Sequence, residues 1–333
     1  MTNYELGKAP VGLRAGRVMV AASLGGEPVT IHLRTADPAV SIKGLWTQHG
    51  AGYMGMFNRP STELPKQVTL SVARADGRPF PAEPRLNVTA TVGLDSVSWT
   101  VAGLGGMPVA DVVTLSVDDD WLTFARPAGI EPPNDNLTGG AASMAAAARQ
   151  VLGVASVPPT QRAHVVVAVD PSGSMKTRQV RSSLNEALEG IAGIHAVLGG
   201  EGKRLEWYLA TSPPRRYDDP EALLEALEEA AYGLGSSLDL PSLAPSNGNE
   251  LSVVYLISDD VPGSLAQFAD VDMQARHLVV VANPATAPAA VGPVDVTVWP
   301  AGPLDDSRRP ALAKDLLRGC FDANSACGRA VGA

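Results

Sequence analysis

The sequence is poor in cysteine, in aromatic residues and in long apolar runs. Its 333 residues include two cysteines, Cys320 and Cys327, and aromatic residues make up 5%. A single late pair is no disulfide framework, so we expect two ordinary thiols in a reducing compartment. No stretch approaches the ~18 consecutive apolar residues of a membrane span, and no basic segment followed by an apolar core opens the chain. These absences predict a soluble, cytoplasmic protein without a membrane partner.

Basic residues are also in the minority. The chain has 26 Lys and Arg against 35 Asp and Glu, which gives a net charge of −9. Residues 1–160 carry 12 basic and 13 acidic side chains, whereas residues 161–333 carry 14 and 22. General nucleic-acid binding is disfavoured because phosphate contacts need clustered Lys and Arg. The acidic second half is better suited to binding a cation.

Residues 1–126 have the pattern of an all-β domain. Glycine and proline, 33 and 27 in the whole chain, supply many turns, and alternation such as Val68-Thr69-Leu70-Ser71-Val72 indicates strands with one buried face. Short strands at this spacing predict an antiparallel β-sandwich. The expected strands are Arg17–Ala22, Pro28–Arg34, Val40–Leu45, Gln67–Arg74, Leu86–Val92, Ser96–Ala102, Ala110–Val117 and Trp121–Arg126.

The pattern then changes. Residues 127–160 read as a Pro/Gly-rich linker that carries an Ala-rich helix at Ala141–Leu152. In residues 161–333, apolar runs alternate with helical patterns, which predicts a doubly wound α/β domain with a mostly parallel sheet. The expected strands are Ala163–Val169, Leu205–Ala210, Leu251–Ile257, His277–Ala282 and Val294–Trp299. The expected helices are Lys176–Leu198, Pro220–Tyr232, Ser264–Val271 and Asp306–Phe321.

One segment carries recognisable chemistry. The apolar run Val165–Val169 leads directly into Asp170-Pro171-Ser172-Gly173-Ser174. In a doubly wound sheet, ligands bind outside the carboxyl ends of the strands, and Asp170 stands at such an end. A carboxylate and two hydroxyls are hard oxygen ligands, which suit Mg²⁺ or Mn²⁺ better than a soft metal. The alternative is that these residues merely cap and turn the chain into the next helix.

Here residues 161–322 resemble the von Willebrand factor A (VWA) family, whose metal-ion-dependent adhesion site has the pattern Asp-x-Ser-x-Ser. The family adds a hydroxyl, usually Thr, from a Gly-rich loop, which here reads Gly233-Leu234-Gly235-Ser236-Ser237-Leu238. It also adds an Asp from a Thr-Asp-Gly pattern, here Ser258-Asp259-Asp260. The resemblance implies metal ligands Asp170, Ser172, Ser174, Ser236 and Asp259, with Ser237 as the alternative to Ser236.

The resemblance implies a non-enzymatic binding module. A divalent cation, Mg²⁺ first and Mn²⁺ or Ca²⁺ as alternatives, would coordinate an Asp or Glu of a protein partner. A structural subunit of a phage or secretion-type particle, with a vestigial metal site, is a second interpretation. The sandwich-plus-VWA layout also looks like that of bacterial stress-response proteins associated with tellurite resistance.

A metal-assisted hydrolase is the least favoured interpretation. The matched segments contain no evident general base, and P-loop, zinc-protease and nucleophile-elbow motifs are absent from the sequence. Asp118-Asp119-Asp120 could bind Ca²⁺ at a rim of the sandwich, or form a charged turn before Trp121. The sequence therefore predicts metal-dependent binding rather than catalysis.

Overall fold

The structure, a computed structural model, divides the chain into two compact units, residues 1–135 and 136–333. It describes residues 2–7, 9–35, 54–61, 64–101, 103–118, 120–127, 137–199, 203–229, 251–263, 265–269, 273–281, 290–300 and 304–332. The expected strand Val40–Leu45 and the loop Gly233–Leu238 lie outside these residues.

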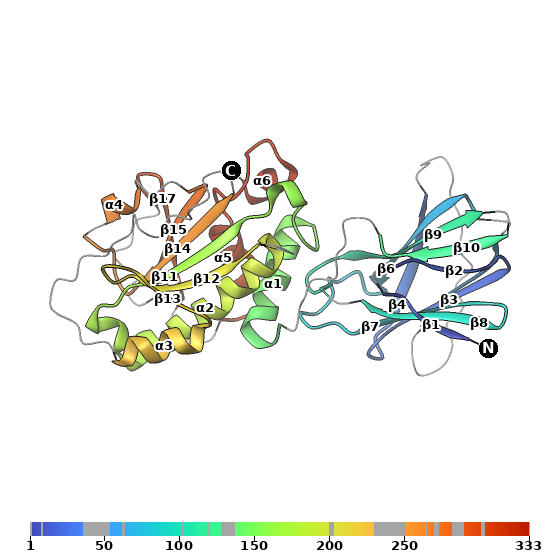
Figure 1. Cartoon of the computed structure of the whole chain (residues 1–333), viewed down its shortest axis with the longest axis horizontal. Helices are drawn as coiled ribbons and strands as arrows, with labels where there is room; N and C mark the ends of the chain where they lie inside the picture. The colour runs from blue at the N-terminus through green and yellow to red at the C-terminus, as the bar shows by residue number, and fades with distance from the viewer. Residues whose placement is uncertain are drawn as a thin grey trace. The chain divides into compact units, whose positions relative to one another are not determined.

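The N-terminal unit is a β-sandwich of two five-stranded sheets (Figure 1). One sheet has, in spatial order, β1 (Asn3–Glu5), β8 (Asp95–Val101), β7 (Leu86–Val92), β3 (Arg17–Leu24) and β5 (Met54–Pro60). The other has β2 (Val11–Arg14), β10 (Trp121–Ala125), β9 (Val109–Asp118), β6 (Gln67–Arg74) and β4 (Val29–Thr35). The pairing is antiparallel except between β1 and β8. The predicted all-β fold is confirmed.

Alternating side chains explain this sandwich. In β7, Leu86, Val88, Ala90 and Val92 are buried while the residues between them are more exposed. This alternation directs one face of each strand toward the opposite sheet, where the apolar side chains form one continuous core. Strands β1, β2 and β5 were not expected from the sequence.

The C-terminal unit contains one seven-stranded sheet. Its order is β13 (Arg215–Tyr217), β12 (Leu205–Leu209), β11 (His164–Val169), β14 (Ser252–Ser258), β15 (Ala275–Val280), β17 (Val294–Val298) and β16 (Ala290–Val291). The five inner strands are parallel, and the two edge strands are antiparallel to their neighbours. The predicted doubly wound, mostly parallel α/β fold is therefore confirmed.

Helices cover both faces of this sheet (Figure 1). Val165, Val167 and Val169 of β11 belong to a core shared with α1 (Gly139–Leu152), α2 (Arg178–Leu198), α3 (Pro220–Glu229), α5 (Arg309–Leu316) and α6 (Ala326–Val331). Val166 and Ala168 belong to a second core that includes α4 (Leu265–Ala269). A strand buried on both faces reads as a continuous apolar run, which is why β11 was recognisable.

The Ala-rich helix α1 belongs to the second unit and not to a linker between the two units. It packs against α2 and α5, and its buried residues Met144, Ala145 and Ala148 join the core of the α/β unit. On α2, Gly193 lacks a side chain where the backbone of Ala141 comes close. Small residues on both helices permit this close approach. The Ala-rich segment that we interpreted as part of a linker therefore forms one helix of a packed pair.

The structure also bears on the expectations for the two cysteines and for membrane-spanning helices. Cys320 and Cys327 are both buried and free. Among the helices of the described ranges, none combines the length and the apolarity needed to cross a membrane.

Candidate metal centre

The centre of the α/β sheet brings two polar strand ends together. Strands β11 and β14 are parallel neighbours, with Val169 opposite Ile257. The N–H of Asp170 continues this ladder by donating to the carbonyl oxygen of Ile257 at 2.9 Å. Asp170 and the residues that follow Ile257 therefore lie at one carboxyl edge, as expected for a ligand site in a doubly wound fold.

The carboxylate of Asp170 is oriented by two hydrogen bonds. Its Oδ1 accepts from the backbone N–H of Ser172 at 2.8 Å, and its Oδ2 accepts from the hydroxyl of Ser258 at 2.7 Å. The residue is only 9% exposed. An ionised carboxylate oxygen has about two acceptor positions, so each oxygen retains capacity for a further partner such as a cation.

The two serines of the motif bring their hydroxyls together. The Oγ atoms of Ser172 and Ser174 are 3.0 Å apart, with Ser172 half-buried and Ser174 exposed. Two oxygens on one edge of an octahedron around Mg²⁺, each about 2.1 Å from the ion, are separated by about 3 Å. The hydroxyl pair therefore fits adjacent positions around a hard cation, and each hydroxyl can bind through a lone pair.

A short helical turn fixes this pair. Ser172 and Ser174 flank Gly173 at the start of η3 (Gly173–Lys176), and one residue separates the end of η3 from the start of α2. The N–H of Met175 donates to the carbonyl oxygen of Ser172 at 3.2 Å, and the buried Met175 side chain joins the apolar core. The serine side chains are thus carried on a turn anchored to the core.

The end of α3 is tied to the same region. Lys176 Nζ donates to the carbonyl oxygen of Glu228 at 3.0 Å, and Arg181 forms an ion pair with the Glu228 carboxylate. The predicted ligand Ser236 and its alternative Ser237 follow α3 in the sequence but lie outside the described residues. Their part in the site remains a prediction.

Asp259 and Asp260 follow Ser258 at the end of β14. Asp259 is half-buried and Asp260 is exposed. Within the described part of the chain, the Asp259 carboxylate has no hydrogen-bond or ion-pair partner. The Asp260 N–H approaches Ser258 Oγ at 3.5 Å, and Asp260 Oδ1 accepts from the N–H of Val261 at 2.8 Å. The Asp259 side chain is therefore available for a water or a cation.

Sequence reasoning missed the role of Ser258. Its side chain is 2% exposed and connects β14 to the carboxylate on β11. The signal was its position immediately before Asp259, where the family pattern has Thr. The residues thus supply a carboxylate, two adjacent hydroxyls and a second, unpartnered carboxylate, a donor set chemically suited to Mg²⁺ or Mn²⁺.

This donor set differs from a site made of titratable side chains. Among the described residues, no group of three or more His, Cys, Asp or Glu side chains is arranged to hold a metal ion. No known family model, curated protein or solved structure matches the chain.

Proposed function

We propose that the C-terminal unit is a non-enzymatic, cation-dependent protein-binding module. Asp170, Ser172 and Ser174 would hold a divalent cation, Mg²⁺ in the first instance, with Mn²⁺ or Ca²⁺ as alternatives. Ser236 and Asp259 would complete the coordination directly or through water. An Asp or Glu side chain of a protein partner would occupy the remaining position.

The orientation of Asp170 is the observation that carries this proposal. Burial of a carboxylate is unfavourable unless the group is hydrogen-bonded or paired with a charge, and here two neutral donors hold both oxygens of Asp170 in place. The same arrangement aligns it with the strand edge from which the serine turn departs. A cation would add the charge compensation that these neutral donors do not provide.

The resemblance to the VWA family supports the choice of partner. The segments containing Asp170, Ser236 and Asp259 occur in the family's order along the chain. The resemblance implies that the metal completes its coordination with a carboxylate of a partner protein, as it does in that family. Binding is favoured over hydrolysis because the matched segments supply no His or Glu that could act as a general base.

One observation favours the structural-subunit alternative. Both oxygens of Asp170 already accept hydrogen bonds inside the protein, so the turn could be stable without a cation. In that case the α/β unit would contribute packing surfaces to an assembly, and its stability would not depend on divalent ions.

Direct metal titration distinguishes these functions. Calorimetry with Mg²⁺ and Mn²⁺ on the full chain should show one site, which D170A removes, while the exposed control D305A leaves binding intact. Ligand binding to the native state stabilises it by about 2.7 kcal/mol at a hundredfold excess over Kd, so the melting temperature should rise with added metal. An equal rise in D170A would locate the ion elsewhere, and no rise in either protein would reject the proposal.

Partner binding is tested separately. Pull-downs with the full chain in Mg²⁺ and in EDTA should recover a partner only with Mg²⁺, and D170A should recover none. A partner retained in EDTA, or a stable assembly that EDTA leaves unchanged, would favour the structural-subunit function.

A further inference from the structure

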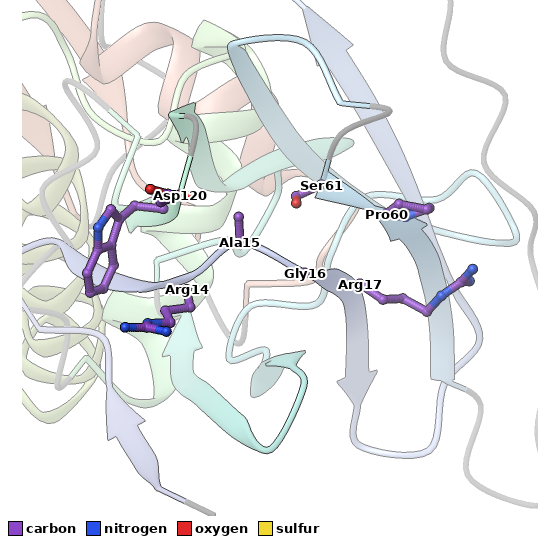
Figure 2. Close-up of a pocket in the computed structure, with 8 residues that line it drawn as sticks. Arg14, Ala15, Gly16, Arg17, Pro60, Ser61 and Asp120 are labelled. Atoms are coloured by element: carbon purple, nitrogen blue, oxygen red, sulfur yellow. The ribbon is translucent and has the colours of Figure 1, made fainter.

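The rim of the β-sandwich contains a pocket unrelated to the metal centre. It lies where the chain crosses from β2 in one sheet to β3 in the other, and its volume is about 650 Å³ (Figure 2). Figure 2 shows Arg14 and Asp120 at one end of the pocket, Arg17 and Pro60 at the other, and Ser61 between them. The pocket therefore combines residues from three separate segments of the unit.

Backbone hydrogen bonds fix the crossing segment. The N–H of Ala15 donates to the carbonyl oxygen of Asp120 at 2.9 Å, and the N–H of Ser61 donates to the carbonyl oxygen of Gly16 at 2.8 Å. These bonds tie the crossing to the β9–β10 turn on one side and to the end of β5 on the other. A pocket framed in this way is pre-formed, which reduces the entropic cost of binding.

Trp121 supplies an apolar surface at this rim. It is the first residue of β10, pairs with Arg14 across the sheet, and is 51% exposed. Its ring lies over Gly12, because a side chain added there would meet the indole at 3.7 Å. The indole therefore lies close to the backbone of β2 while about half of the residue faces solvent.

Charged groups without partners lie beside Trp121, one on its neighbour in the sequence and one on its partner in β2. Within the described ranges, the side chains of Arg14 and Asp120 make no hydrogen bond or ion pair, although both line the pocket. Ser61 is only 2% exposed, lines the same pocket, and its hydroxyl has no hydrogen-bond partner among the described residues. A pocket hydroxyl without a protein partner is available to donate to or accept from a ligand or water.

We propose that this pocket binds a neutral saccharide. The C–H face of a sugar ring would lie on the indole of Trp121, and adjacent ring hydroxyls would donate to Asp120. Arg14 would donate to hydroxyl oxygens, and Ser61 can both donate and accept. One apolar surface with a few convergent polar groups is the usual composition of a small-molecule site.

The charges of the pocket favour an uncharged ligand. Asp120 would repel an anion that the arginines attract, and Arg14 and Arg17 would repel a cation that Asp120 attracts, so an ion of either sign leaves part of the pocket uncompensated. A purely apolar ligand would leave the Arg14 guanidinium and the Asp120 carboxylate desolvated without partners, which is unfavourable. A polyhydroxylated ring satisfies all of these groups at once.

Nuclear magnetic resonance of the full chain tests the proposal. The indole N–H signal of Trp121, assigned from its loss in W121F, should shift saturably with maltose or cellobiose, at a Kd on the order of 1 mM. D120A and R14A should each weaken binding at least about tenfold, the change expected from losing a hydrogen bond to a charged group. Two variants of exposed residues outside the pocket, R85A and Y4A, are matched controls and should bind as the wild type does.

Three outcomes would overturn the proposal. The first is the absence of a shift with either disaccharide up to about 20 mM, a concentration that would detect even weak affinity. The second is a shift that D120A and R14A leave unchanged, because the sugar would then bind elsewhere. The third is saturable binding of inorganic phosphate, strengthened in D120A, in place of sugar binding, which would identify an anion site.

Discussion

The hydroxyl of Ser258 donates a hydrogen bond of 2.7 Å to Oδ2 of Asp170. This bond connects the ends of two adjacent parallel strands, β14 and β11, and it holds the carboxylate oxygen that does not accept from the Ser172 N–H. Ser258 is therefore a positioning residue for the candidate metal centre, because it acts on a cation only through Asp170.

S258A is expected to weaken Mg²⁺ and Mn²⁺ binding about tenfold, the lower end of the losses seen when a partner of a metal ligand is removed. The control is S252A, which alters a serine that is equally buried, 2% exposed, at the opposite end of the same strand. Calorimetric titration measures both. Equal affinities in S258A and the wild type would show that Ser258 does not support a cation site.

The ease of prediction differed between Asp170 and Ser258 for a physical reason. Asp170, Ser172 and Ser174 are close in sequence, so their relation is local and visible in the motif. Ser258 lies far along the chain, and its contact with Asp170 exists only because β11 and β14 pair in one register. Within its own segment, Ser258 is simply the last residue of a buried strand.

The same distinction applies to the fold. The ranges Gln67–Arg74 and Leu86–Val92 were predicted as they occur, because alternation marks a strand with one buried face. Strand β1 was missed because all three of its residues are exposed, so no alternation marks it. Asp219 caps the start of α3, because its Oδ1 accepts from the N–H of Ala222 at 2.8 Å.

A buried histidine should make stability depend on pH. His277 is fully buried and stacks on Tyr255 with ring centroids 4.9 Å apart. Burial, with a smaller effect of the nearby Arg318 charge, lowers the pKa of His277 to about 3. The unfolded chain, with a histidine pKa of about 6.5, then binds more protons than the folded chain between these values. Stability is therefore fully present above about pH 6.5 and falls as the pH drops toward 3.

From this group alone we expect a loss of about 2 kcal/mol between pH 7.5 and pH 5. H277F keeps a ring against Tyr255 but cannot titrate. Between pH 7.5 and pH 5, its unfolding free energy should therefore fall by about 2 kcal/mol less than that of the wild type. Urea unfolding at the two pH values provides the measurement. H32Q, which changes an exposed histidine, is the control and should show the same change of unfolding free energy between the two pH values as the wild type. If H277F retained it as well, His277 would not be the responsible group.

The contact between α1 and α2 depends on a glycine. A Cβ added at Gly193 would overlap the carbonyl oxygen of Ala141 and lie 2.9 Å from the N atom of Ala145. Because both are backbone atoms, the helices would have to separate, and we expect G193A to lower the unfolding free energy by about 1–3 kcal/mol. At Gly140 the nearest atom belongs to the flexible Glu189 side chain, so G140A should be neutral or slightly stabilising. Comparable destabilisation by both variants in urea would contradict this packing.

The packing of α1 also predicts where the α/β unit begins as an independently folding fragment. Met144, Ala145 and Ala148 are at most 1% exposed and belong to its core, and burial of a side chain the size of Met144 contributes about 1.5–3 kcal/mol. A fragment of residues 136–333 should therefore unfold cooperatively in urea, whereas 161–333, which lacks α1, should be several kcal/mol less stable or aggregate. Limited proteolysis of the full chain should accordingly yield a resistant fragment beginning between residues 127 and 138. If 161–333 proved as stable as 136–333, α1 would be an attached segment that the α/β core does not need.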